Sequence, residues 1–272
     1  MFQGLTAQEA ARPSGGPLDD LSMSPKRPKD GADGEAWAPV IGLPPSTDAY
    51  RLLPRFRTGD RRMPVGRDLF RIGETNKSIF NLLSGWVVIY TLLEDGRRQI
   101  VHFALPGAVM GVPTSNGAKI SYGAQALTEV VVSVIPNTVL ATVLKDDPEV
   151  SMRLASTLAR DTSIAYDHMT SIGRRTARER VAYLLLELFT RHRAQWPGNH
   201  IEEMVIPLTQ EQIGDATGLT FVHVNRVLST LRKDKIVHFH YRRLRILDPD
   251  RLIEVAGIDP QTAMSWFERR ST

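Results

Sequence analysis

The segment 208–237, LTQEQIGDATGLTFVHVNRVLSTLRKDKIV, constrains the fold of this chain more than any other. Two glycines, Gly214 and Gly218, lie four positions apart between two short amphipathic patterns. A helix–turn–helix needs a small residue where its second helix approaches the first, and a residue that accepts a left-handed turn between them. The segment therefore predicts two helices joined by a tight turn.

Other positions in the segment meet the remaining needs of this motif. Thr209 and Gln212 have capping-box spacing at the start of the first helix. Thr220 is an N-cap for the second helix, which is predicted to reach Lys233. Four apolar residues are spaced to hold the helices together: Ile213, Leu219, Val224 and Val227. A helical hairpin of another fold is the alternative.

Positive charge is concentrated in the same region. The whole chain has 34 basic and 30 acidic residues, a net charge of +4. Between residues 221 and 245 only Asp234 is acidic and seven residues are basic, so this segment carries +6 and the rest −2. The basic residues are Arg226, Arg232, Lys233, Lys235, Arg242, Arg243 and Arg245. Such a cluster neutralises phosphates and releases counterions, which favours a DNA-binding surface over a merely solvated face.

The start of the second helix is where a recognition helix contacts base edges. Arg226 fits the two acceptors of guanine, and Asn225 fits adenine. His223 is a candidate phosphate contact. Phe221 and Val222 either touch a thymine methyl group or pack against the protein.

Backbone contacts are expected on either side of that helix. Thr209 and Gln210, at the N-terminus of the first helix, are placed to meet a phosphate. Thr220, which opens the second helix, is counted with the DNA-binding residues. Arg242 and Arg243 are predicted at the tip of a wing formed by strands 236–240 and 243–247, on the DNA backbone.

Residues 46–140 predict a compact antiparallel β domain, because short apolar runs alternate with Gly, Pro and Asp. Turns are expected at Asp95-Gly96 and at Pro106-Gly107. The strands are expected at 78–83, 86–93, 98–104, 122–127 and 130–135. Connections this short favour a barrel or roll. With the helices that follow, the fold class is α+β.

Residues 141–173 predict a long helix, with Asp147-Pro148-Glu149 as its N-terminal signal and Gly173 as its end. Small and apolar residues recur along it at spacings of four and three: Ser151, Ala155, Leu158, Thr162, Ala165, Met169 and Ile172. Such a heptad seam suits close packing of two helices. A helix packed on its own domain is the alternative.

The two ends of the chain differ from the rest. Residues 1–45 hold 7 of the 17 prolines and 6 of the 20 glycines, and we expect them to be disordered. The alternative is that a piece around 37–43 docks on the body. Residues 174–255 are expected to form the DNA-binding unit, and 256–272 a C-terminal tail.

Several classes of protein are excluded. The absence of cysteine excludes disulfides, cysteine-ligated zinc or iron–sulfur clusters and thiol nucleophiles. No metal-ligand spacing, phosphate loop, nucleophile elbow or paired-carboxylate site indicates an enzyme. No apolar run approaches the roughly 20 residues of a membrane helix, and no signal pattern opens the chain. We therefore expect a cytoplasmic protein without a membrane partner.

From about residue 50 to 255 the chain resembles the Crp–Fnr family of bacterial transcription regulators. The motifs that carry the resemblance are LSGWVV at 83–88, DGRRQI at 95–100, LPG at 105–107 followed by Gly111, RERVA at 178–182, and the helix–turn–helix. The resemblance implies a cyclic nucleotide-binding-like β-roll sensor, a dimerisation helix at 141–173 and a winged helix–turn–helix. It also implies a homodimer on a near-palindromic operator, and RNA polymerase as a partner if the protein is an activator.

Departures from the family pattern limit what the sensor detects. Members that bind cyclic AMP carry a Glu and an Arg near the phosphate, whereas Lys119 is the one charged residue between 107 and 125. Cyclic AMP is therefore not expected, and neither is a cysteine-ligated cluster. A lone His102 does not support haem. Val222 stands where the family commonly has Glu. The competing hypothesis is an effector-binding sensor or protein-interaction module without direct promoter control.

Overall fold

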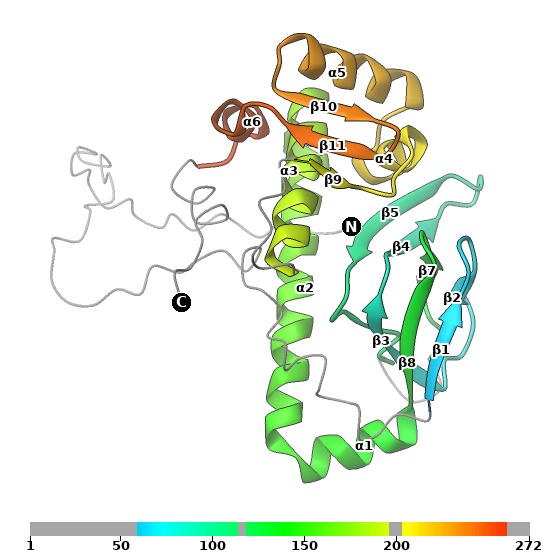
Figure 1. The fold of residues 1–272 in the computed structure, drawn as a ribbon. Helices are drawn as coiled ribbons and strands as arrows, with labels where there is room; N and C mark the ends of the chain where they lie inside the picture. The colour runs from blue at the N-terminus through cyan, green and yellow to red at the C-terminus, as the bar shows by residue number, and fades with distance from the viewer. Residues whose placement is uncertain (1–58, 114–117, 196–202, 260–272) are drawn as a thin grey trace, which may run out of the picture. The chain divides into compact units, whose positions relative to one another are not determined.

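The computed structural model describes residues 59–113, 118–195 and 203–259 (Figure 1). Three predictions fall outside the described residues. They are the disorder of residues 1–45, the alternative that a piece around 37–43 docks on the body, and the part of the C-terminal tail at 260–272. Within the described residues, no helix combines the length and the apolar character that crossing a bilayer requires.

Two four-stranded antiparallel sheets form the β domain, so the predicted roll is confirmed. Their strand orders are β1-β8-β3-β6 and β2-β7-β4-β5. The strands are β1 (Gly59–Met63), β2 (Asp68–Phe70), β3 (Ser78–Ser84), β4 (Val87–Leu92), β5 (Arg98–Ala104), β6 (Val109–Met110), β7 (Gly123–Ala126) and β8 (Val130–Pro136). Every strand expected in this region lies within one residue of its predicted bounds. The short strands β1, β2 and β6 were not predicted.

Strand β4 is buried on both of its faces, which explains its continuous apolar sequence. Val87 and Ile89 lie in the core of the roll. Val88 and Tyr90 lie in a second core shared with the C-terminal helices. The β domain thereby packs directly against the C-terminal region.

Two helices follow β8, α1 (Asn137–Asp146) and α2 (Pro148–Arg174). As predicted, Asp147 caps α2, and its carboxylate accepts a hydrogen bond from the backbone N–H of Val150 at 3.1 Å. Helix α2 therefore starts where the sequence signal placed it, and the segment 141–173 assigned to the dimerisation helix also includes the second half of α1, which ends at the break in helical geometry at Asp147.

Helix α2 ends one residue beyond the predicted Gly173. Gly173 has no left-handed backbone, and the helix continues through it to Arg174. It ends because Arg175 is extended, with φ −81° and ψ 149°. The glycine is therefore an ordinary helical residue.

The seam on α2 is not the face by which this helix packs on its own chain. Met169 is 64% exposed, and Ala155, Thr162 and Ala165 are exposed as well, whereas Leu158 and Ile172 are partly covered. A different set of α2 residues is buried: Val150, Leu154, Ile164 and Ser171. Met152 and Tyr166, which the heptad pattern did not include, add exposed apolar surface, at 69% and 62%. The role of the seam in dimerisation stays a prediction.

Helix α3 (Ala177–Gln195) forms the centre of the C-terminal region, and residues 181–190 are all buried. Packed around it are α4 (Gln210–Thr217), α5 (Phe221–Lys233) and α6 (Pro249–Ala256). A three-stranded sheet of order β10-β11-β9 completes the unit. Its strands are β9 (Glu203–Val205), β10 (Val237–His240) and β11 (Arg243–Ile246). Helix α6 was not predicted.

His102 on β5 is largely covered by its surroundings beside α2 and α3, with 11% of its side chain exposed and both ring nitrogens buried. Among the residues that the structure describes, neither of its ring nitrogens has a hydrogen-bond partner, and Asp161 Oδ1 lies 4.0 Å from Nε2. Burial lowers the pKa of His102 well below its usual range, and the charges of Arg191, His168 and Arg160 lower it further. The ring is therefore uncharged in the folded protein.

Acidification should destabilise the protein through His102. The unfolded chain takes up a proton near pH 6.5 and the buried ring does not. The free energy of unfolding should therefore fall as the pH drops below about 6.5, by up to about 1.4 kcal/mol per pH unit from this group. Urea unfolding between pH 5 and pH 7 should show a shallower pH dependence for His102→Leu than for the wild type.

Other groups cancel in that comparison. Burial also raises the pKa of Asp161, which acts in the opposite direction, and lowers that of His192, which acts in the same one. Both groups are present in both proteins, so the difference between the two slopes reports His102. Equal slopes of unfolding free energy against pH in the two proteins would show that His102 takes up a proton in the folded protein as readily as in the unfolded chain.

Candidate DNA-binding surface

The first helix of the motif begins with the predicted capping box. Thr209 Oγ1 accepts a hydrogen bond from the backbone N–H of Gln212 at 3.1 Å, and Gln212 Oε1 accepts from the N–H of Thr209 at 2.9 Å. Two of the free N–H groups at the N-terminus of α4 are satisfied in this way. The hydroxyl hydrogen of Thr209 can still be donated to a phosphate.

The turn between the helices depends on two glycines. Gly218 is left-handed, with φ 68° and ψ 31°. At Gly214 a Cβ atom would lie 2.5 Å from the carbonyl oxygen of Leu219, so the chain that enters α5 passes directly over this position. Both predicted requirements of the motif are confirmed.

Helix α5 is divided into a buried and an exposed face. The buried residues are Val224, Val227, Leu228 and Leu231. His223, Asn225 and Arg226 are exposed. Thr220 caps the helix, and its side chain accepts a hydrogen bond from the N–H of His223 at 3.3 Å. The residues predicted to read bases therefore stand on the solvent side, with α5 beside β10 (Figure 1).

Gln210 and Asn225, 15 positions apart, are in direct contact. Asn225 Nδ2 donates to Gln210 Oε1 at 3.1 Å, and Ser229 Oγ donates to Asn225 Oδ1 at 3.4 Å. These bonds hold the Asn225 amide in one orientation. Gln210 is thus a positioning partner for Asn225, a role that the sequence prediction missed.

The wing is a hairpin whose tip is the pair Tyr241 and Arg242, with φ of 49° and 63°. Arg242 is exposed at this tip. Arg243 lies on β11, and its Nη1 donates to Glu203 Oε1 at 2.8 Å. Arg242 therefore lies at the wing tip as predicted, whereas Arg243 lies on the adjoining strand β11 beside a carboxylate of β9.

The sequence prediction missed the aromatic side chains of the wing. His238 and His240 are exposed, and their stacked rings have centroids 6.0 Å apart. The ring centroid of Tyr241 lies 4.0 Å from that of His240, in an edge-to-face arrangement. Residues at i and i+2 of a strand share a face. That spacing within 237–240 was a signal that could have identified this pair of histidines.

The surface is strongly positive. All seven basic residues between 221 and 245 are exposed. Asp234 forms an ion pair with Arg178 of α3, at 2.6 Å between Oδ2 and Nη2. The one acidic residue of the segment is therefore already matched by a cation outside it.

A polar contact joins the β domain to the motif. Arg98 Nε of β5 donates to Asp215 Oδ2 of α4 at 2.8 Å, and Gln99 Nε2 donates to the carbonyl of Ala216 at 3.3 Å. Both side chains of the ion pair are about three-quarters buried, at 26% and 22% exposed. A rearrangement of β5 would thus act directly on α4.

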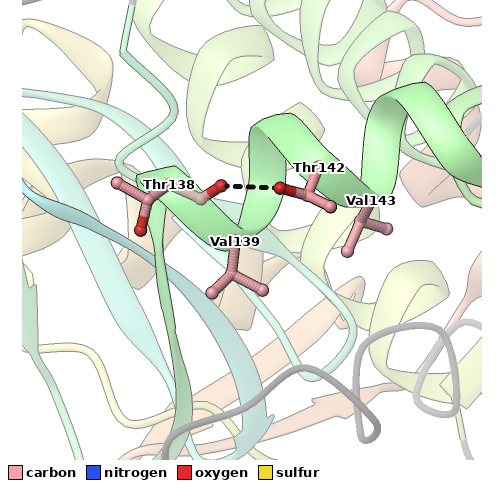
Figure 2. Close-up of a pocket in the computed structure, with 4 residues that line it drawn as sticks. All are labelled: Thr138, Val139, Thr142 and Val143. Atoms are coloured by element: carbon pink, nitrogen blue, oxygen red, sulfur yellow. Dashed lines mark hydrogen bonds between the residues drawn. The ribbon is translucent and has the colours of Figure 1, made fainter.

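An open pocket lies along α1, in a part of the sequence well before the helix–turn–helix. Figure 2 shows its lining, Thr138, Val139, Thr142 and Val143, and its volume is about 330 Å³. Thr142 Oγ1 donates to the carbonyl of Thr138 at 3.3 Å. With two valines and two threonines, the lining offers no titratable group.

Known proteins share this arrangement. A Crp-like helix-turn-helix domain matches residues 179–255, and a cyclic nucleotide-binding domain matches residues 60–147. The nitrogen fixation regulation protein FixK of Bradyrhizobium diazoefficiens is 31% identical over 213 residues, which are 78% of this chain and 88% of that protein. The chain belongs to the Crp–Fnr family. It is therefore a DNA-binding transcription regulator with a sensor domain.

Other members of the Crp–Fnr family agree with this assignment. The transcriptional activatory protein AadR of Rhodopseudomonas palustris is 31% identical over 70% of this chain and 77% of its own length. The structure of FixK2 from Bradyrhizobium japonicum superposes with a TM-score of 0.65 and 30% identity, over 72% of this chain and 96% of that one. Crp–Fnr regulators bind DNA and act as dimers.

Proposed function

We propose that this protein is a homodimeric activator that binds a near-palindromic operator with α5 in the major groove. The observation that carries the proposal is the exposed N-terminal half of α5, fixed over Gly214 and surrounded by basic side chains. The name of AadR supports activation, and an activator would contact RNA polymerase. Because its partner is chromosomal DNA, the protein would act in the cytoplasm, as a regulator and not as an enzyme.

The dimer is supported by the uncovered seam of α2. Four residues of this stripe are exposed: Ala155, Thr162, Ala165 and Met169. Two others on the same stripe, Leu158 and Ile172, are partly covered. Small side chains along one stripe let two helices approach closely. A two-fold dimer presents two copies of α5, so the operator would have half-sites about one helical turn apart.

Each side chain of the surface has a proposed role. Arg226 reads guanine, and Asn225, held by Gln210, reads adenine. Thr209, Thr220 and His223 contact phosphates near the helix N-termini. Arg242 and Arg243 contact the backbone from the wing.

The signal that acts on the β domain is proposed to be neither cyclic AMP nor a redox cluster. Lys119, the one cation between 107 and 125, is exposed, and a chain without cysteine has no thiolate for iron. His102 is buried beside Asp161 and Arg191 and is a poor haem ligand there. Millimolar cyclic AMP should leave the melting temperature unchanged, and a clear increase would contradict this proposal.

Binding to DNA upstream of the protein's own gene tests the proposed function. A mobility-shift titration should show a complex at low salt that competitor DNA of unrelated sequence does not displace. Sedimentation should give two protein chains per DNA duplex. The competing hypothesis, a sensor or interaction module without promoter control, predicts negligible affinity for every DNA even at low salt.

Arg242→Gln should weaken binding to all sequences alike. The plot of log K against log salt should become shallower by about 0.9 for each phosphate contact that is lost. Arg243→Gln should have the smaller effect, because Glu203 competes with phosphate for its guanidinium. Lys145→Gln, which removes an exposed cation from α1, serves as the control. An unchanged slope for Arg242→Gln would remove the wing tip from the interface.

A further inference from the structure

Two large apolar side chains are exposed on the first turn of α5. Phe221 is 55% and Val222 is 56% exposed. The other apolar residues of this helix, from Val224 to Leu231, are buried against the motif. The structure thus does not show the alternative in which these side chains pack into the protein, and their contact with a thymine methyl group stays a prediction.

Their neighbours on the helix are the hydrogen-bonding side chains of the surface. Residues four apart lie on the same helix face, so Phe221 stands next to Asn225 and Val222 next to Arg226. Both pairs are exposed, on a segment with seven basic residues. Two exposed apolar side chains within such a basic surface suit contact with an apolar group on a negatively charged partner such as DNA.

The major groove offers one such feature. Thymine carries a 5-methyl group there, and the other base edges present hydrogen-bond donors and acceptors. A side chain in the first turn of a recognition helix reaches the base edges. Covering the methyl group would also remove part of the exposed Phe221 and Val222 surface from water.

We propose that Phe221 and Val222 form a methyl-reading pair that selects thymines beside the bases read by Asn225 and Arg226. The proposal rests on the proposed function, since it places α5 in the major groove. It names the chemical group that is recognised, the 5-methyl of thymine. Half-sites of this regulator therefore contain thymines that are selected by contact with their methyl groups.

Deoxyuridine substitution tests this directly. Replacing one thymine of the operator by deoxyuridine removes the methyl group and leaves the hydrogen-bonding edge unchanged. Fluorescence anisotropy should show about a fourfold loss of affinity at one or two positions in each half-site, the factor expected for one buried methyl-sized group. Substitution at the other thymines should have no effect.

Variants assign each methyl group to a side chain. Val222→Ala and Phe221→Ala should each bind the thymine and deoxyuridine operators equally at one of these positions. Val65→Ala, which shortens a valine that is 63% exposed in the β domain, should keep the full thymine preference.

The outcomes separate the two proposals. Tight binding with equal affinity for thymine and deoxyuridine at every position would overturn the methyl-reading pair and leave the proposed function intact. A preference for thymine that persists at the same position in both Val222→Ala and Phe221→Ala would also overturn it. Failure to bind any unmodified operator would overturn the proposed function, and the methyl-reading pair with it.

Discussion

Gly214→Ala should abolish specific DNA binding at protein concentrations that saturate the operator with the wild type. The added Cβ atom would lie 2.5 Å from the carbonyl oxygen of Leu219, which is a backbone atom with no flexible side chain to yield. The start of α5 has to move, and Arg226 and Asn225 move with it. Overpacking of this kind costs about 1–3 kcal/mol of stability, which thermal unfolding would measure beside the DNA titration.

The matched control is Gly173→Ala. Gly173 is helical and exposed, and a Cβ atom there would meet nothing within 4 Å. Alanine should be neutral or stabilise α2 by up to about 1 kcal/mol, because it is the better helix former. If Gly214→Ala bound the operator as tightly as the wild type, the close crossing of α4 and α5 would be wrong.

Arg226→Ala should reduce affinity for the operator by about 5- to 150-fold, which corresponds to about 1–3 kcal/mol for a bidentate contact with guanine. The loss should be confined to specific DNA. A scan of all four bases at each position should show that one base pair per half-site is no longer discriminated.

Arg251→Ala is the control for the loss of one positive charge. Arg251 is exposed on α6, outside the surface formed by α5 and the wing. Its removal should lower the affinity for all DNA slightly and leave the base preferences intact. An unchanged base profile for Arg226→Ala would show that Arg226 contacts only the backbone.

Local sequence patterns were sufficient to predict those elements whose structure depends on residues close together in the sequence. The helix–turn–helix was predictable because its caps and glycines act within about ten residues. The main strands were predictable from short apolar runs between turns. Helix α6 was missed although Asp248-Pro249 repeats the cap of α2, Asp147-Pro148; Asp248 accepts a hydrogen bond from the N–H of Arg251 at 3.0 Å.

Contacts between distant segments were not predictable. Glu203 lies 40 residues before Arg243, and Asp215 lies 117 residues after Arg98, so no periodicity relates these pairs. Side-chain partners of this kind depend on how strands and helices pack, and on that packing alone. They change what Arg243 can do, although its position in the wing was correctly predicted.

The seam of α2 shows a further limit. Helical spacing tells which residues share a face, and the stripe that includes Ala165 and Met169 was evident from the sequence. Spacing does not tell what that face meets. The structure shows that the chain's own core takes a different face of α2, through Leu154 and Ile164, and leaves the stripe exposed.

Selection of bound sequences from random DNA by the purified protein tests the central claim most directly. A homodimer that reads bases with α5 should enrich a two-fold symmetric sequence, with half-sites about 10 base pairs apart from centre to centre. Each half should contain a guanine whose enrichment disappears with Arg226→Ala. No enriched sequence, or a single half-site without its symmetric copy, would contradict the account.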